Sequence, residues 1–109
     1  MVKQFDIATI ELDPIRGREK GKTRPVLIVS NELINNHTDF VWVMPITSRP
    51  KKYPMDIELV TERNKVYGIV DTVQLRCLDY KSRKGKVIDH LAKNLHQDIL
   101  DTVAVHIEK

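Results

Sequence analysis

The sequence feature that most constrains the fold is residues 21–31, which read GKTRPVLIVSN in this 109-residue chain. The four residues at 26–29 are aliphatic without polar alternation, a pattern typical of a strand that is buried on both faces. Pro25 fixes its own φ and biases Arg24 towards an extended backbone. The sequence therefore predicts that Arg24 stands at a rigid junction between a basic loop and a buried strand.

An arginine held in this way has two interpretations. One is phosphate binding, because the planar guanidinium can donate two parallel hydrogen bonds to two phosphate oxygens. An ordinary salt bridge at the end of a strand is the other, and residues 21–31 alone favour neither.

Short strands separated by turns are predicted along most of the chain. The expected strands are 5–12, 25–30, 40–46, 55–60, 67–70, 72–78 and 86–88. A long polar loop is expected at 15–23, and a short helical turn within 31–39.

The C-terminal part differs because apolar side chains recur every four residues. They are Leu91, Leu95, Ile99, Val103 and Ile107. This spacing predicts a helix, and Asn94 and Gln97 have the spacing of a capping box. We therefore expect one domain over residues 1–109, mainly β, with the C-terminal helix packed on a small twisted antiparallel sheet or barrel.

The net charge is only +3, but the cations are concentrated in loops. Five lie within residues 16–24, a second group within 49–52 and a third within 76–86, whereas 89–109 holds four acids and two lysines. This distribution indicates a face that binds a polyanion such as a nucleic acid. The alternative is that these are ordinary solvated loops.

Several classes of site are not supported by the sequence. The single cysteine, Cys77, excludes an intrachain disulfide, and we expect its thiol to pack in a strand. The four histidines show no metal-ligand spacing, so no metal or cofactor is expected. The longest apolar run is too short for a membrane span and residues 1–6 lack a signal-peptide core, so we expect a cytoplasmic protein.

Two hydroxyl residues, Thr47 and Ser48, follow the strand predicted at 40–46 and precede a basic loop. They are candidates for contact with phosphate oxygens, although such a pair also serves as a turn cap. RNA can be cleaved with few protein groups, because its own 2′-hydroxyl is the nucleophile. An arginine and a hydroxyl at neighbouring strand ends would stabilise charge on the phosphate, each donor contributing about 3 to 4 kcal/mol. The sequence offers no histidine near these positions for proton transfer.

The chain resembles the MazF/PemK family of toxin endoribonucleases from residue 5 to about residue 107. The segments that carry the resemblance are LDP at 12–14, GREKGKTRPVLIVSN at 17–31, PITS at 45–48, YP at 53–54, GIV at 68–70 and QLRCLD at 74–79. No single segment is decisive, but their order and spacing together are specific.

This resemblance implies an SH3-like or CcdB-like barrel that forms a homodimer. It also implies metal-independent, sequence-specific cleavage of single-stranded RNA that leaves a 2′,3′-cyclic phosphate and a 5′-hydroxyl. The implied protein partner is a cognate antitoxin whose disordered acidic tail covers the RNA groove.

Residue by residue, Arg24 matches the family arginine that stabilises the transition state and is implicated in proton transfer. Thr47 matches the threonine that binds the scissile phosphate, and Gln74 matches the family glutamine. The expected RNA contacts are Arg16, Arg18, Glu19, Lys20, Lys22, Ser48, Arg49, Lys51, Lys52, Gln74 and Arg76. Among these, residues 18–20 fall in the loop that gates the RNA groove.

The chain departs from the PemK-like branch at three positions. Arg18 stands where that branch has a loop histidine, and Asp71 and Val73 stand where it has an arginine and an aspartate. The acid and base groups of that branch are therefore absent, while the MazF-like pair of Arg24 and Thr47 is retained.

Two non-enzymatic alternatives remain. One is a CcdB-like toxin that binds DNA gyrase, although the chain lacks the Trp-Gly-Ile-like C-terminus of such binders. The other is an RNA-binding module whose aromatic residues stack on bases. Because most of those aromatics lie at strand positions, we expect most of them in the core; the five are Phe40, Trp42, Tyr53, Tyr67 and Tyr80.

Overall fold

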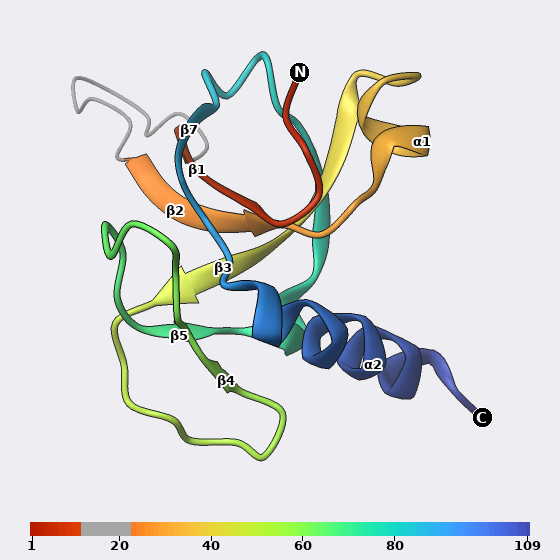
Figure 1. Ribbon diagram of the computed structural model, residues 1–109. Helices are drawn as coiled ribbons and strands as arrows, with labels where there is room; N and C mark the ends of the chain where they lie inside the picture. Colours follow the sequence, from red (N-terminus) through yellow and green to blue (C-terminus); the bar gives the residue numbers. More distant parts are fainter. Residues whose placement is uncertain (12–22) are drawn as a thin grey trace, which may run out of the picture.

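A computed structural model of the chain describes residues 1–11 and 23–109 (Figure 1). Five of the residues expected to contact RNA lie outside the described residues. They are Arg16, Arg18, Glu19, Lys20 and Lys22. The expected loop at 15–23 likewise falls almost entirely outside this range.

The described chain forms one antiparallel sheet with a helix packed against it. The strands are β1 Asp6–Glu11, β2 Thr23–Ile28, β3 Phe40–Thr47, β4 Ile57–Glu58, β5 Ile69–Val70, β6 Arg76–Asp79 and β7 Lys86–His90. The helices are α1 Glu32–Asn35 and α2 His96–Ile107, and the 3₁₀ turns are η1 Thr72–Gln74 and η2 Lys93–Leu95.

The strand order is β4-β5-β3-β2-β1-β7, and β6 also pairs with β3. The sheet curls into a half-barrel, and α2 packs below it in Figure 1. The predicted fold class, mainly β with a C-terminal helix on a small twisted antiparallel sheet, is confirmed. No helix in the described part of the chain is both long and apolar enough to cross a membrane.

β2 is shared by two hydrophobic cores, one on each face of the sheet. Leu27 lies in a core with Ile99 of α2, whereas Ile28 lies in a second core with Leu78 of β6. All four residues at 26–29 are buried, as predicted from the unbroken aliphatic run. The strand that carries Arg24 is therefore fixed from both sides.

Several predicted boundaries were wrong. Residues 72–74 form the 3₁₀ turn η1 and not the start of a strand, and the strand expected at 55–60 is reduced to Ile57–Glu58. The reduction follows from Asp56, which is 1% exposed and accepts backbone hydrogen bonds from Lys52 and Tyr53 at 2.9 Å. A carboxylate that closes such a turn cannot alternate outwards in an extended strand.

The predicted capping box at the start of the C-terminal helix was also wrong. The chain enters α2 through η2, which contains Asn94, and the N-cap is Leu95 without a side-chain hydrogen bond. Backbone bonds replace the cap, because the N–H of Leu95 donates to the carbonyl of Ala92 at 3.0 Å.

The expectation that most aromatics and the cysteine would be packed was wrong. Phe40, Trp42, Tyr53 and Tyr67 are exposed, Tyr67 by 76%, and only Tyr80 packs against a core. Cys77 is also exposed. Phe40 and Trp42 are on β3, and in Figure 1 the start of β3 rises towards α1, away from α2.

Candidate nucleic-acid interface

Arg24 and Thr47 lie near the same ends of two neighbouring strands, at the start of β2 and the end of β3. β2 pairs with β3 antiparallel, with Val26 opposite Pro45 and Leu27 opposite Met44. Arg24 is two residues before Val26 and Thr47 two residues after Pro45, so the same register places them level. Figure 1 shows the start of β2 and the end of β3 on the same side of the molecule.

The two side chains also share a face of the sheet. Successive side chains of a strand alternate between faces, so Arg24 points to the same face as Val26, and Thr47 to the same face as Val43. Both valines belong to the same hydrophobic core. Arg24 is exposed, so its guanidinium is accessible beside the end of β3.

The hydroxyl of Thr47 is unusual because Oγ1 is buried and has no hydrogen-bond partner within residues 1–11 and 23–109. A buried polar atom left unpaired costs about 1 to 3 kcal/mol, and such atoms are rare enough in folded proteins to require an explanation. A ligand oxygen reaching the end of β3 would supply the missing partner.

Gly68, directly before β5, packs closely against the backbone of Thr47. Its φ is +134°, and a Cβ at this position would lie 2.1 Å from the carbonyl oxygen of Thr47. Only glycine tolerates both conditions. β5 can therefore start tightly against the end of β3, where Ile69 pairs with Thr47. From the sequence, this glycine stood out only as part of the GIV segment at 68–70, and its close contact with Thr47 was not predicted.

Arg49, one of the expected RNA contacts, is held in an ion pair. Its Nη1 donates to Asp56 Oδ2 at 2.7 Å and its Nη2 to Asp56 Oδ1 at 3.1 Å. Arg49, and after it the backbone N–H of Tyr53, hold the pKa of Asp56 well below its ordinary value. The guanidinium therefore shapes the loop at 49–56, a role that the strand predicted at 55–60 did not indicate.

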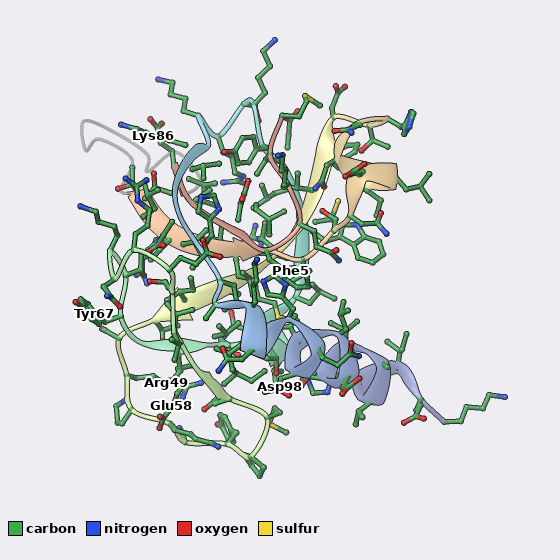
Figure 2. The ribbon with its side chains drawn as sticks, viewed as in Figure 1. Phe5, Arg49, Glu58, Tyr67, Lys86 and Asp98 are labelled. Atoms are coloured by element: carbon green, nitrogen blue, oxygen red, sulfur yellow. The ribbon has the colours of Figure 1, made fainter. Side chains whose placement is uncertain are left out.

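That loop presents its other polar groups to solvent. Ser48, Lys51 and Lys52 are exposed, and Lys52 Nζ lies 5.3 Å from the centre of the Tyr53 ring. Figure 2 shows Arg49 and Glu58 in the same lower region of the molecule, near β4 and β5, and Tyr67 projecting from its left edge. Two lysines and a hydroxyl thus follow Thr47 on one accessible loop.

Gln74 and Arg76 lie beyond β5. Gln74 is exposed on η1, and its Nε2 donates to Asp71 Oδ2 at 3.0 Å. Asp71 is buried, and its Oδ2 is also 3.7 Å from Arg49 Nη2. Arg76 is exposed at the start of β6, opposite Val43. Arg49 therefore links the loop after Thr47 to the turn that carries Gln74.

The histidines make contacts elsewhere. His90 Nδ1 is 2.8 Å from Asp6 Oδ1, His106 Nε2 is 3.0 Å from Thr72 Oγ1, and His96 stacks on Phe5 at 3.9 Å. Across residues 1–11 and 23–109, no three side chains of His, Cys, Asp or Glu gather closely enough to hold a metal ion.

An exposed apolar strip runs along β3 and β6. Trp42 pairs with Cys77, and Phe40, two residues earlier on β3, pairs with Asp79. Trp42 is 43% exposed, Phe40 49% and Leu75, just before β6, 37%. Leu75 also lines a groove of about 420 Å³ between η1 and α2, together with Met44, Met55, Thr72, Val73, Val103, His106 and Ile107. We call this surface the apolar strip.

Known proteins share both the sequence pattern and the fold. Residues 3–107 match the PemK-like, MazF-like toxins of type II toxin–antitoxin systems. A MazE–MazF crystal structure from Deinococcus radiodurans superposes with a TM-score of 0.85 and 24% identity, over 97% of this chain and 95% of that chain.

Mycobacterial structures are similar too. An endoribonuclease gives a TM-score of 0.75 and 19% identity, over 95% of this chain and 88% of that chain. A mycobacterial endoribonuclease in complex with its cognate antitoxin gives a TM-score of 0.76 and 19% identity, over 100% of this chain and 99% of that chain. At these identities the solved structures establish the fold, whereas the sequence match spans nearly the whole chain. This chain therefore belongs to the PemK-like, MazF-like family of toxins of type II toxin–antitoxin systems.

Proposed function

We propose that this toxin is an endoribonuclease that cleaves single-stranded RNA at specific sequences, without a metal ion, in the cytoplasm. The observation that carries the proposal is the accessible Arg24 opposite Thr47, whose buried hydroxyl lacks a partner in the described chain. A mycobacterial protein of the same fold is described as an endoribonuclease, which supports the same activity here.

In the proposed reaction the ribose 2′-oxygen attacks the adjacent phosphorus while the bond from phosphorus to the 5′-oxygen breaks. The products are a 2′,3′-cyclic phosphate and a 5′-hydroxyl, so one proton leaves the 2′-hydroxyl and one reaches the 5′-oxygen. Arg24 and the hydroxyl of Thr47 donate hydrogen bonds to the phosphate oxygens on which negative charge builds, each worth about 3 kcal/mol. Arg24 also takes part in proton transfer, the role that the family resemblance assigns to it.

The remaining RNA contacts are electrostatic and polar. Lys51, Lys52 and Ser48 extend the binding surface beyond Thr47, and Arg76 and Gln74 extend it beyond β5. The residues of the loop before β2 complete it; they are Arg16, Arg18, Glu19, Lys20 and Lys22. Arg49 acts indirectly, because both of its terminal nitrogens bind Asp56.

The proposed assembly is a homodimer that buries the apolar strip. Exposed aromatics next to an apolar groove are typical of the centre of a protein interface and unusual on a monomer surface. A second copy of the chain is the occupant that the family resemblance implies. At the C-terminal end of α2, Val105 and Ile107 are 63% and 77% exposed and continue the same apolar character.

The proposed protein partner is an antitoxin with a disordered acidic segment. A basic surface that binds RNA phosphates also attracts carboxylates, and the chain carries a net charge of +3. Relatives of the same fold have been crystallised with MazE or with a cognate antitoxin, which supports such a partner.

The test is cleavage of a long mixed-sequence RNA in EDTA by the wild type and by Arg24→Ala, with the fragment ends mapped. We expect cuts at one recurring motif in the wild type and at least a hundredfold fewer in the variant, with the fold unchanged because Arg24 is exposed. A folded wild type that cuts nothing, or a variant that cuts normally, would refute the proposal.

A further inference from the structure

Asp71 is held on several sides at the point where β5 leads into η1. It is only 6% exposed, and its backbone N–H donates to the carbonyl of Pro45 at 2.9 Å. Its Oδ2 accepts a hydrogen bond from Gln74 Nε2 at 3.0 Å and lies 3.7 Å from Arg49 Nη2. One carboxylate oxygen therefore faces both a cation and an amide.

The cation is itself fixed. Asp56 holds both terminal nitrogens of Arg49, and it accepts the backbone N–H groups of Lys52 and Tyr53 as well. Arg49 Nη1 also donates to the carbonyl of Pro50 at 3.2 Å. The guanidinium is therefore not free to leave Asp71, and the position of that carboxylate is defined by the loop at 49–56.

This arrangement decides which end of the Gln74 amide faces outwards. A glutamine amide carries two donors on its nitrogen and an acceptor on its oxygen, and a carboxylate oxygen can only accept. The nitrogen of Gln74 must therefore face Asp71, which turns Oε1 away from it. Because Gln74 is exposed, its amide presents Oε1 and the second N–H to a ligand in an order that Asp71 fixes.

We propose that Asp71 is a positioning residue that fixes the direction of the Gln74 amide and so sets the base preference at one position of the RNA. This inference rests on the proposed ribonuclease function. With its nitrogen held by Asp71, the amide favours a base whose edge offers a donor to Oε1 and an acceptor to the second N–H in that order, and disfavours a base whose groups stand in the reverse order. One such contact gives roughly tenfold discrimination or more.

Three variants test this through the base frequencies at mapped cut sites. Gln74→Ala identifies the position that Gln74 reads, by flattening the base preference there. Asp71→Ala frees the amide to turn over, so it should flatten the same position at least fivefold and leave the others unchanged. Asp71→Asn should keep the preference, because Arg49 holds the remaining oxygen towards Gln74.

The readout separates positioning from a merely structural role, because partial unfolding lowers all cuts alike and leaves relative frequencies unchanged. The inference is overturned if Asp71→Ala retains the preference that Gln74→Ala removes, or if Gln74→Ala alters no position. A wild type that cuts no RNA overturns the proposed function, and this inference with it.

A second measurement applies even if Asp71→Ala does not fold. In the wild-type protein, the side-chain amide NMR signals of Gln74 are assigned by their loss in Gln74→Ala. We expect one of the two protons to be shifted downfield and slow to exchange with water. Two protons that both exchange like those of a free glutamine would overturn the inference.

Discussion

Gly68 and the carbonyl of Thr47 lie so close that a Cβ on the glycine would be 2.1 Å from the oxygen. The end of β3, where the proposed phosphate contact sits, is thus defined by the backbone of the neighbouring strand. This contact ties the shape of the site to a residue that itself offers no side chain to RNA.

Gly68→Ala should therefore damage both stability and cleavage. The added methyl group meets backbone and not a side chain that can turn aside, and φ at this position is +134°. We expect a loss of about 3 kcal/mol in the free energy of unfolding. Urea unfolding measures it, and a variant as stable as the wild type would show that β5 can move away from Thr47 at little cost.

Thr47→Val should separate function from stability. Valine has nearly the shape of threonine but removes the hydroxyl that has no partner in the described chain. Stability should be unchanged or rise by about 1 kcal/mol, since an unpaired buried group is lost. Cleavage should fall about 10²-fold to 10³-fold if the hydroxyl binds the phosphate. Thermal unfolding and initial cleavage rates test the two parts, and full activity would exclude Thr47 from the reaction.

Asp56→Asn should make the free energy of unfolding less dependent on pH in the acid range. The hydrogen bond from Arg49 and those from the loop backbone lower the pKa of Asp56 in the folded state. A carboxyl group with a lowered pKa stabilises the fold above its unfolded pKa, about 3.9, and this contribution is lost as pH falls through the folded value. The variant should be less stable at neutral pH, and its deficit should shrink below about pH 4.

Unfolding by urea at several pH values measures that deficit. Glu58→Gln is the control, because Glu58 is the exposed residue of β4 next to the same loop. This variant removes a negative charge without removing these hydrogen bonds. A deficit that stays constant from neutral to acid pH would contradict the expectation.

Trp42→Glu should convert the proposed dimer to a monomer. Trp42 lies in the middle of the apolar strip, and a buried unpaired carboxylate there would be strongly unfavourable. Light scattering after gel filtration should show the mass fall by half. Leu33→Glu on α1, at a residue that is 73% exposed, is the matched control and should leave the mass unchanged. A wild type that is already monomeric would refute the dimer.

The sequence was sufficient for features that depend on neighbouring residues. The aliphatic run after Pro25 predicted a strand buried on both faces, and both cores contact it. Arg24 and Thr47 were each expected at a strand end. Their alignment could not be predicted without the resemblance, because register depends on pairing between segments about twenty residues apart.

The misinterpreted residues depend on distant partners. Asp56 lies in the segment predicted as a strand at 55–60, yet it is buried in a turn, where Arg49 and two backbone N–H groups satisfy its oxygens. Trp42 looked like a core residue, yet it is exposed because α2 packs elsewhere on the sheet. In both cases the pattern was correct for an isolated strand, and the tertiary packing changed the outcome.

The sharing of β2 between two cores has a consequence for local opening of the molecule. A segment that must leave both cores to open does so only when most of the structure is lost, so its amide hydrogens exchange at the rate of global unfolding. Arg24 is attached to this segment. If RNA and an antitoxin bind this surface in turn, as proposed, the backbone that carries the arginine stays in register through the exchange.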